Sequence, residues 1–129
     1  MPVVNFSVPL PTIFEGGSER AYKNMVADAA WEAAMAGPPD EHVLWPANGA
    51  KGTEVEIIIT MHCEDMPFSK VEKETKLIVE GAGMSMWNKK YPPKKVTHVQ
   101  IPWSKKGPGA EVKVIQWQGG SGGTNDSKK

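Results

Sequence analysis

Apolar and polar residues alternate over the first eight positions, as they do along a strand with one buried face. The apolar side of this strand consists of Pro2, Val4, Phe6 and Val8. A longer alternating run lies near the middle of the chain and is rich in isoleucine and valine, which favour strands. The same reasoning predicts strands over residues 2–8, 41–45, 54–62, 96–103 and 111–117.

The segment from residue 18 to residue 36 is rich in alanine, and its apolar residues have helical spacing. Ser18 is a candidate N-cap, because a serine hydroxyl can accept a hydrogen bond from the first turn of a helix. Gly37 and the two prolines after it form a stop signal. These signals predict a helix that fills this segment.

The segment from residue 70 to residue 86 supports two interpretations. Ser69 and Glu72 match a capping box, which predicts a helix beginning at about Lys70. However, apolar and charged residues also alternate from Val71 to Glu80, as they would along an edge strand. We favour the helix and keep the edge strand as the alternative.

The order of these elements predicts an α/β (α+β) fold. Two βαβ units would form one mixed sheet with both helices on one face, followed by a C-terminal β-hairpin. Residues 1–118 are expected to form this single domain. Residues 119–129 are glycine-, serine- and lysine-rich and are expected to be a disordered tail, since they contain nothing to bury.

Composition narrows the class of protein. The 129 residues are 40% hydrophobic and 23% charged with a formal net charge of zero, so no electrostatic footprint for nucleic acid or an anionic membrane is expected. Arg20 is the sole arginine and Cys63 the sole cysteine, which excludes an intrachain disulfide. Without an apolar leader or a run of about 18 apolar residues, the protein is expected to be cytoplasmic.

Pro2 is the first candidate for chemistry. Removal of the initiator methionine would leave its secondary amine free at the start of an apolar strand face. A terminal amine titrates near pH ~8, and apolar surroundings favour its neutral form. A neutral amine can remove a proton next to a carbonyl group. The alternative is that a proline in this position only begins a strand.

The element order and Met1-Pro2 together resemble the tautomerase superfamily, in particular the branch of macrophage migration inhibitory factor. Similar local features are Val8-Pro9, the double proline after the first helix, and the range 91–96 leading into a strand. The resemblance implies Pro2 as the general base on a small keto or enol substrate. It also implies a homotrimer in which a neighbouring subunit completes each pocket, and no cofactor.

The chain departs from that branch at two places in the expected pocket. Gly37 stands where a lysine usually holds an acidic substrate, and Thr97 stands where an aromatic hydroxyl is usual. Thr97 is therefore the aligned substrate-binding residue, and His62 joins it because catalytic groups often follow a central strand in α/β folds. His42, His62 and His98 have no spacing typical of a zinc site, so no metal is expected.

Two functions are consistent with the sequence. The first is a small oligomeric tautomerase-like isomerase with Pro2 as its base. The second is a non-catalytic α/β module that assembles through sheet edges and tryptophan-rich surfaces, since five tryptophans are many for this length. Trp103 and Trp117 would either face each other across the expected hairpin or mark a subunit interface.

Overall fold

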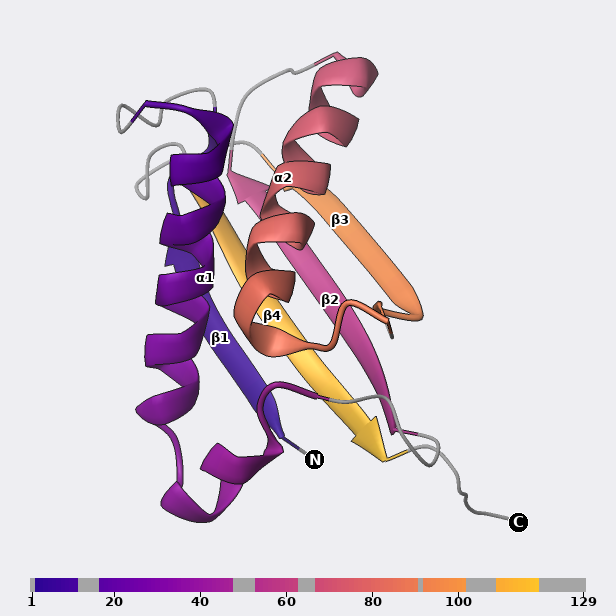
Figure 1. The fold of residues 1–129 in the computed structure, drawn as a ribbon. Helices are drawn as coiled ribbons and strands as arrows, with labels where there is room; N and C mark the ends of the chain where they lie inside the picture. The colour runs from indigo at the N-terminus through magenta and orange to yellow at the C-terminus, as the bar shows by residue number, and fades with distance from the viewer. Residues whose placement is uncertain are drawn as a thin grey trace, which may run out of the picture.

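A computed structural model describes residues 2–11, 17–47, 53–62, 67–90, 92–101 and 109–118. The described residues form a four-stranded mixed sheet in the order β1-β4-β2-β3 (Figure 1). The strands are β1 (Val3–Val8), β2 (Thr53–His62), β3 (Lys95–Ile101) and β4 (Gly109–Gln118). The predicted α+β class and mixed sheet are therefore confirmed.

The connections between the strands differ from the prediction. β1 and β2 are both antiparallel to β4, which lies between them, and β3 is parallel to β2. β1, β2 and β3 therefore run in one direction, and β2 both ends the first crossover and begins the second. The expected C-terminal hairpin is wrong, because β2 lies between β3 and β4. Consequently Trp117 has no partner across a hairpin, and Trp103 lies outside the described residues.

The predicted strand over residues 41–45 is also wrong. This segment belongs to a short 3-10 helix, η2 (Pro39–Leu44), that begins at the double proline. Proline fixes a helical φ and lacks the N–H that a strand needs, so it favours the first turn of a helix. The element order that carried the family resemblance is thus not repeated in the two halves of the chain.

Both long helices form where they were expected. α1 (Glu19–Met35) begins after Ser18, whose hydroxyl accepts a hydrogen bond from the Ala21 N–H at 3.2 Å, so the predicted N-cap is confirmed. α2 (Phe68–Met86) is one continuous helix, and the edge-strand alternative is excluded. Its N-cap is Pro67, without a side-chain cap, so the predicted capping box at Ser69 is wrong.

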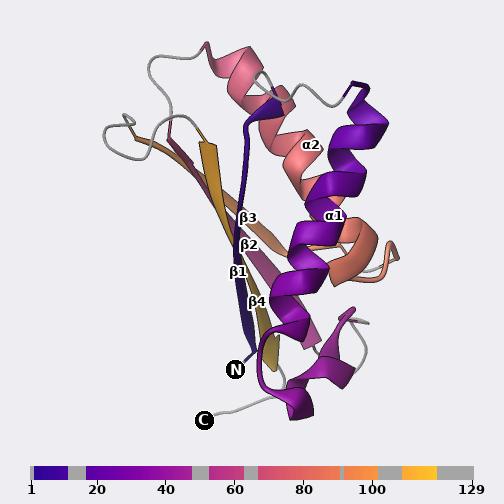
Figure 2. The same cartoon turned by 90° about the vertical axis from the view of Figure 1, so that its left-hand side faces the viewer.

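α1 and α2 cover the same face of the sheet, as Figure 2 shows with the sheet nearly edge-on. The core lies between these helices and the covered face of the strands. Its fully buried members include Val26, Ile57, Ile59, Ile78, Met86 and Val114. Buried residues of α2 recur every three or four positions. This helical spacing explains why the segment forms a helix although its apolar and charged residues also alternate as in a strand.

The helices pack closely on each other. A side-chain carbon at Gly81 would lie 2.8 Å from Val26 Cβ and 3.0 Å from the Lys23 carbonyl oxygen. The Ser85 hydroxyl donates a 2.8 Å hydrogen bond to the Ala27 carbonyl. These contacts fix the spacing of the two helices along their length.

No described helix covers the opposite side of the sheet, which we call the helix-free face. Residues paired across strands point to the same side, and the pairing places sixteen side chains here. They are Val3, Asn5, Ser7, Glu54, Glu56, Ile58, Thr60, His62, Lys95, Thr97, Val99, Ile101, Glu111, Lys113, Ile115 and Trp117. Within the described ranges, no helix is long and apolar enough to cross a bilayer.

Candidate functional site

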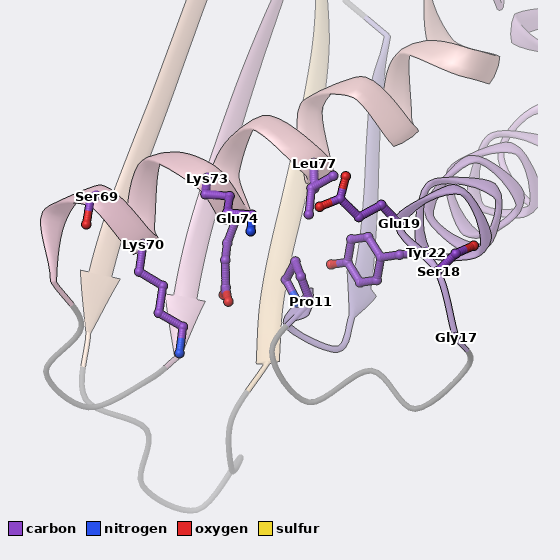
Figure 3. Close-up of a pocket in the computed structure, with 10 residues that line it drawn as sticks. All are labelled: Pro11, Gly17, Ser18, Glu19, Tyr22, Ser69, Lys70, Lys73, Glu74 and Leu77. Carbon is purple, nitrogen blue, oxygen red and sulfur yellow. The ribbon is translucent and has the colours of Figure 1, made fainter.

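A cavity of about 550 Å³ lies between the first turns of α1 and α2 (Figure 3). Both helices begin where the parallel strands β1 and β2 end, which is the usual place for ligand sites in α/β sheets. Residues from both helices and from the segment after β1 line the cavity. They are Pro11, Gly17, Ser18, Glu19, Tyr22, Ser69, Lys70, Lys73, Glu74 and Leu77.

Two ionisable side chains of this cavity are almost completely buried. Glu74 of α2 is 3% exposed and Tyr22 of α1 is 2% exposed. Figure 3 shows the Tyr22 phenol directed from α1 toward α2, on the side where Glu74 lies. Because taking a carboxylate out of water costs several kcal/mol, a buried carboxylate in a cavity wall is a candidate for function.

A hydrogen bond fixes the phenol of Tyr22. Its hydroxyl donates to the Pro9 carbonyl oxygen at 2.7 Å, which ties the end of β1 to α1. Burial, and secondarily the negative charge of Glu74, raise the pKa of Tyr22. The phenol therefore stays protonated at neutral pH, and its oxygen can still accept a hydrogen bond.

Two lysines at the cavity contribute positive charge. Lys70 and Lys73 are exposed, whereas Glu74 is buried, so the ammonium groups belong to the solvent side of the cavity. Within the described residues, the first turn of α2 contains no acidic residue, so that turn itself supplies no carboxylate to the positive end of the helix dipole. Glu19 adds a negative charge to the cavity from the first turn of α1. The lining therefore carries both signs, and a negative group of a ligand is favoured on the α2 side, near the lysines.

Pro2 lies away from this cavity. It is buried at the start of β1, and its carbonyl oxygen accepts a 3.0 Å hydrogen bond from the Gln116 N–H. Val4 and Val8 are also buried, whereas Val3 is exposed, so the predicted apolar face of this strand is confirmed. However, the cavity lies beside the first turns of α1 and α2, and α1 follows the end of β1 that is opposite Pro2.

Thr97 and His62 do not meet Pro2 either. Thr97 pairs with Ile58, and His62 pairs with Ile101, which places both side chains on the helix-free face. Pro2 is on the side of the sheet that the helices cover. His62 Nε2 lies 3.0 Å from a carboxylate oxygen of Glu111 on β4. Within one chain, the three predicted site residues are therefore not brought together.

The three histidines do not converge. His42 Nε2 lies 3.1 Å from the Gly37 carbonyl oxygen. His98 pairs with Ile59, on the opposite side of the sheet from His62. In the part of the chain that the structure describes, no three potential metal ligands cluster. Cys63 and the two acidic residues after it lie outside that part.

Sequence reasoning missed Glu74 and Tyr22, although a signal for both was present. Glu74 lies three residues after Val71 and four before Ile78, so it interrupts the apolar stripe of a helix. Tyr22 lies four residues before Val26, on the buried stripe of α1. The available signal was thus a charged residue within the apolar stripe of a helix that the sequence already favoured.

Neither a protein-family model nor a curated protein matches this chain. The function must therefore be inferred from the geometry of the cavity.

Proposed function

We propose that this protein is a cofactor-independent isomerase of a small keto or enol acid, with Glu74 as its general base. The observation that supports this proposal is the burial of the Glu74 carboxylate, 3% exposed, in the wall of a cavity of about 550 Å³. A drug-sized ligand fits a cavity of ~300–1,000 Å³. The reaction class is the one expected from the sequence, and the base is a different residue.

The proposed reaction moves one proton. The Glu74 carboxylate removes a proton from the carbon next to the carbonyl group, and the C–H electron pair moves into the carbonyl to form an enolate. The ammonium groups of Lys70 and Lys73 stabilise the enolate oxygen or an adjoining carboxylate. Protonated Glu74 then returns the proton to the enolate oxygen or carbon, so no oxidant or reductant is needed.

Burial is what makes Glu74 suitable for this step. A substrate bound in the cavity is held beside the buried carboxylate and out of bulk water, so the two reacting groups are positioned before the proton moves. Tyr22 is not the base, because its raised pKa keeps it protonated. Its phenol instead acts as a neutral wall that positions the substrate between the two helices.

A second candidate keeps Pro2 as the base. The observation that favours it is that Pro2 is buried on the apolar face of β1 with Val4 and Val8. Such surroundings favour a neutral amine once Met1 has been removed. Because Pro2 does not line the cavity between α1 and α2, a neighbouring subunit would have to complete its site.

One kinetic comparison tests both candidates. The ketonisation of enol acids such as the enol of phenylpyruvate would be followed with wild type, Glu74→Gln, Glu72→Gln and Pro2→Ala. Glu72 is an exposed glutamate two residues away on the same helix, which makes it a matched control. We expect Glu74→Gln to lower kcat/KM by about 100-fold or more, and the other two variants to keep wild-type activity.

Other outcomes contradict the proposal. If Pro2→Ala abolishes activity and Glu74→Gln retains it, the second candidate replaces the first. A wild-type protein that is inactive on a panel of 2-keto and enol acids excludes both. Circular dichroism melting of each variant separates a lost base from a lost fold. Glu74→Asp provides a further check, since it keeps the carboxylate but moves it about one bond length away from a substrate in the cavity.

A further inference from the structure

The helix-free face exposes apolar side chains on three of its strands. Val3 of β1 is 38% exposed, Val99 of β3 is 43% exposed and Trp117 of β4 is 43% exposed. These residues lie on both edges and in the interior of the sheet, so the apolar surface is not confined to one corner. Ile115 pairs with Val3, and Ile58 is the diagonal neighbour of both Ile115 and Val99. Apolar side chains therefore cross the face from one edge strand to the other, and apolar surface of this kind marks sites of interaction in soluble proteins.

Two carboxylates of this face, those of Glu56 and Glu111, have partners within the face itself. Glu56 accepts a 2.9 Å hydrogen bond from the Trp117 indole N–H, and its other oxygen lies 3.9 Å from the Lys95 ammonium. Glu111 lies 3.0 Å from His62. A covered charge is costly mainly when it loses its partner. The face can therefore be covered without leaving these carboxylates unpaired.

The helix-free face is large enough to form an interface with a second sheet of the same size. Strands are ~4.8 Å apart and rise ~3.3 Å per residue, so four strands of about eight residues project about 500 Å². Because side chains protrude from the sheet, the accessible surface is larger than this projected area and approaches the ~800 Å² per partner of a standard interface. Two sheets of this size can pack face to face at ~10 Å with their strands roughly aligned.

A second copy of this chain is also electrostatically compatible with the helix-free face. The formal net charge of the protein is zero, so two copies do not repel each other at long range. The helix-free face contains both signs, with Glu54 on β2 and Lys113 on β4. A two-fold arrangement can place such groups opposite their complements, whereas a strongly acidic or basic partner would find no matching surface.

We propose that the helix-free face is the interface of a homodimer in which the sheets of two copies pack face to face. The cavity between α1 and α2 is on the other side of the sheet and stays open to solvent in this arrangement. The dimer is therefore independent of the proposed isomerase activity, and either proposal can fail without the other.

Two matched pairs of substitutions test the interface by sedimentation velocity. Val99 and Val96 lie on the same strand and are 43% and 45% exposed, but Val96 pairs with Ile57 and so points to the other side of the sheet. Trp117 and Trp31 are 43% and 39% exposed, but Trp31 lies on α1. Each of the four residues is replaced by lysine, and circular dichroism confirms that each variant is folded.

We expect wild type to sediment with the mass of two chains. Val99→Lys and Trp117→Lys should raise the dimer dissociation constant by about 100-fold or more, because each buries a lysine ammonium group in an apolar part of the interface. Val96→Lys and Trp31→Lys should leave it unchanged. The proposal is overturned by a wild-type monomer at about 100 µM, by the trimer that the family resemblance implies, or by equal effects within either pair.

Discussion

Gly81 of α2 lies against Val26 of α1 so closely that a methyl group at position 81 would stand 2.8 Å from Val26 Cβ. The Lys23 backbone also lies within 3.0–3.1 Å of that position and cannot rotate away as a side chain could. Only glycine allows the helices to approach this closely. Since the cavity lies between the same two helices, this contact helps to set its width.

Gly81→Ala should lower the free energy of unfolding by about 1–3 kcal/mol, because overpacking outweighs the better helix propensity of alanine. Gly109→Ala is the control, since the nearest described atom to its added carbon would be the Val8 carbonyl oxygen, at an ordinary 3.6 Å. We expect that control to change stability by less than about 0.5 kcal/mol. Urea unfolding of both variants measures the difference, and equal effects would show that the helices can separate without cost.

Two serines near helix starts should respond differently to replacement by alanine. Ser18 caps α1 with a 3.2 Å hydrogen bond from the Ala21 N–H, so Ser18→Ala should cost about 1 kcal/mol. Ser69 lies inside the first turn of α2 and is not its cap, so Ser69→Ala should cost less than about 0.5 kcal/mol. Thermal unfolding of both variants measures the two costs. A larger loss of stability for Ser69→Ala than for Ser18→Ala would indicate that Ser69 caps α2, as the sequence suggested.

Tyr22 should make the protein sensitive to alkali. Its pKa is raised by burial and then by Glu74, so the folded protein holds this proton more tightly than the unfolded chain does. The resulting stabilisation is complete below pH ~10 and is lost as the pH rises toward the folded-state pKa, at up to about 1.4 kcal/mol per pH unit.

Tyr22→Phe should remove this contribution. At neutral pH the variant should be about 1 kcal/mol less stable, because the hydrogen bond to the Pro9 carbonyl is lost. Between pH 10 and pH 11 its stability should fall less steeply than that of wild type. Urea unfolding at several pH values measures both slopes, and parallel slopes would mean that the phenol is accessible to hydroxide.

The sequence was sufficient to predict the helices and strands whose local signals agreed with their packing in the fold. Ser18 and the glycine and prolines after α1 marked that helix correctly, and alternation located β1 and β2. The failures came where the result depends on tertiary pairing. The order β1-β4-β2-β3 is fixed by contacts between distant strands, and no local pattern distinguishes it from a hairpin between β3 and β4. At Pro39, the missing N–H outweighed the short alternation that suggested a strand.

The candidate site was harder to predict than the fold. Pro2 attracted attention because its chemistry is visible in the sequence, and its burial on the apolar strand face was predicted correctly. Glu74 appears unremarkable in a helix that contains several other charged residues. Its significance depends on facing Tyr22 from the neighbouring helix across a cavity, and that pairing is a property of how α1 and α2 pack.

Deuterium exchange provides the most direct test of Glu74 as the base. In D₂O, proton NMR of 2-keto acids such as phenylpyruvate reports the exchange of hydrogen at the carbon next to the carbonyl, whichever way the equilibrium lies. Wild type should accelerate this exchange above the buffer rate, and Glu74→Gln should reduce that acceleration by about 100-fold or more. Equal exchange rates for wild type and a folded Glu74→Gln variant would contradict the account.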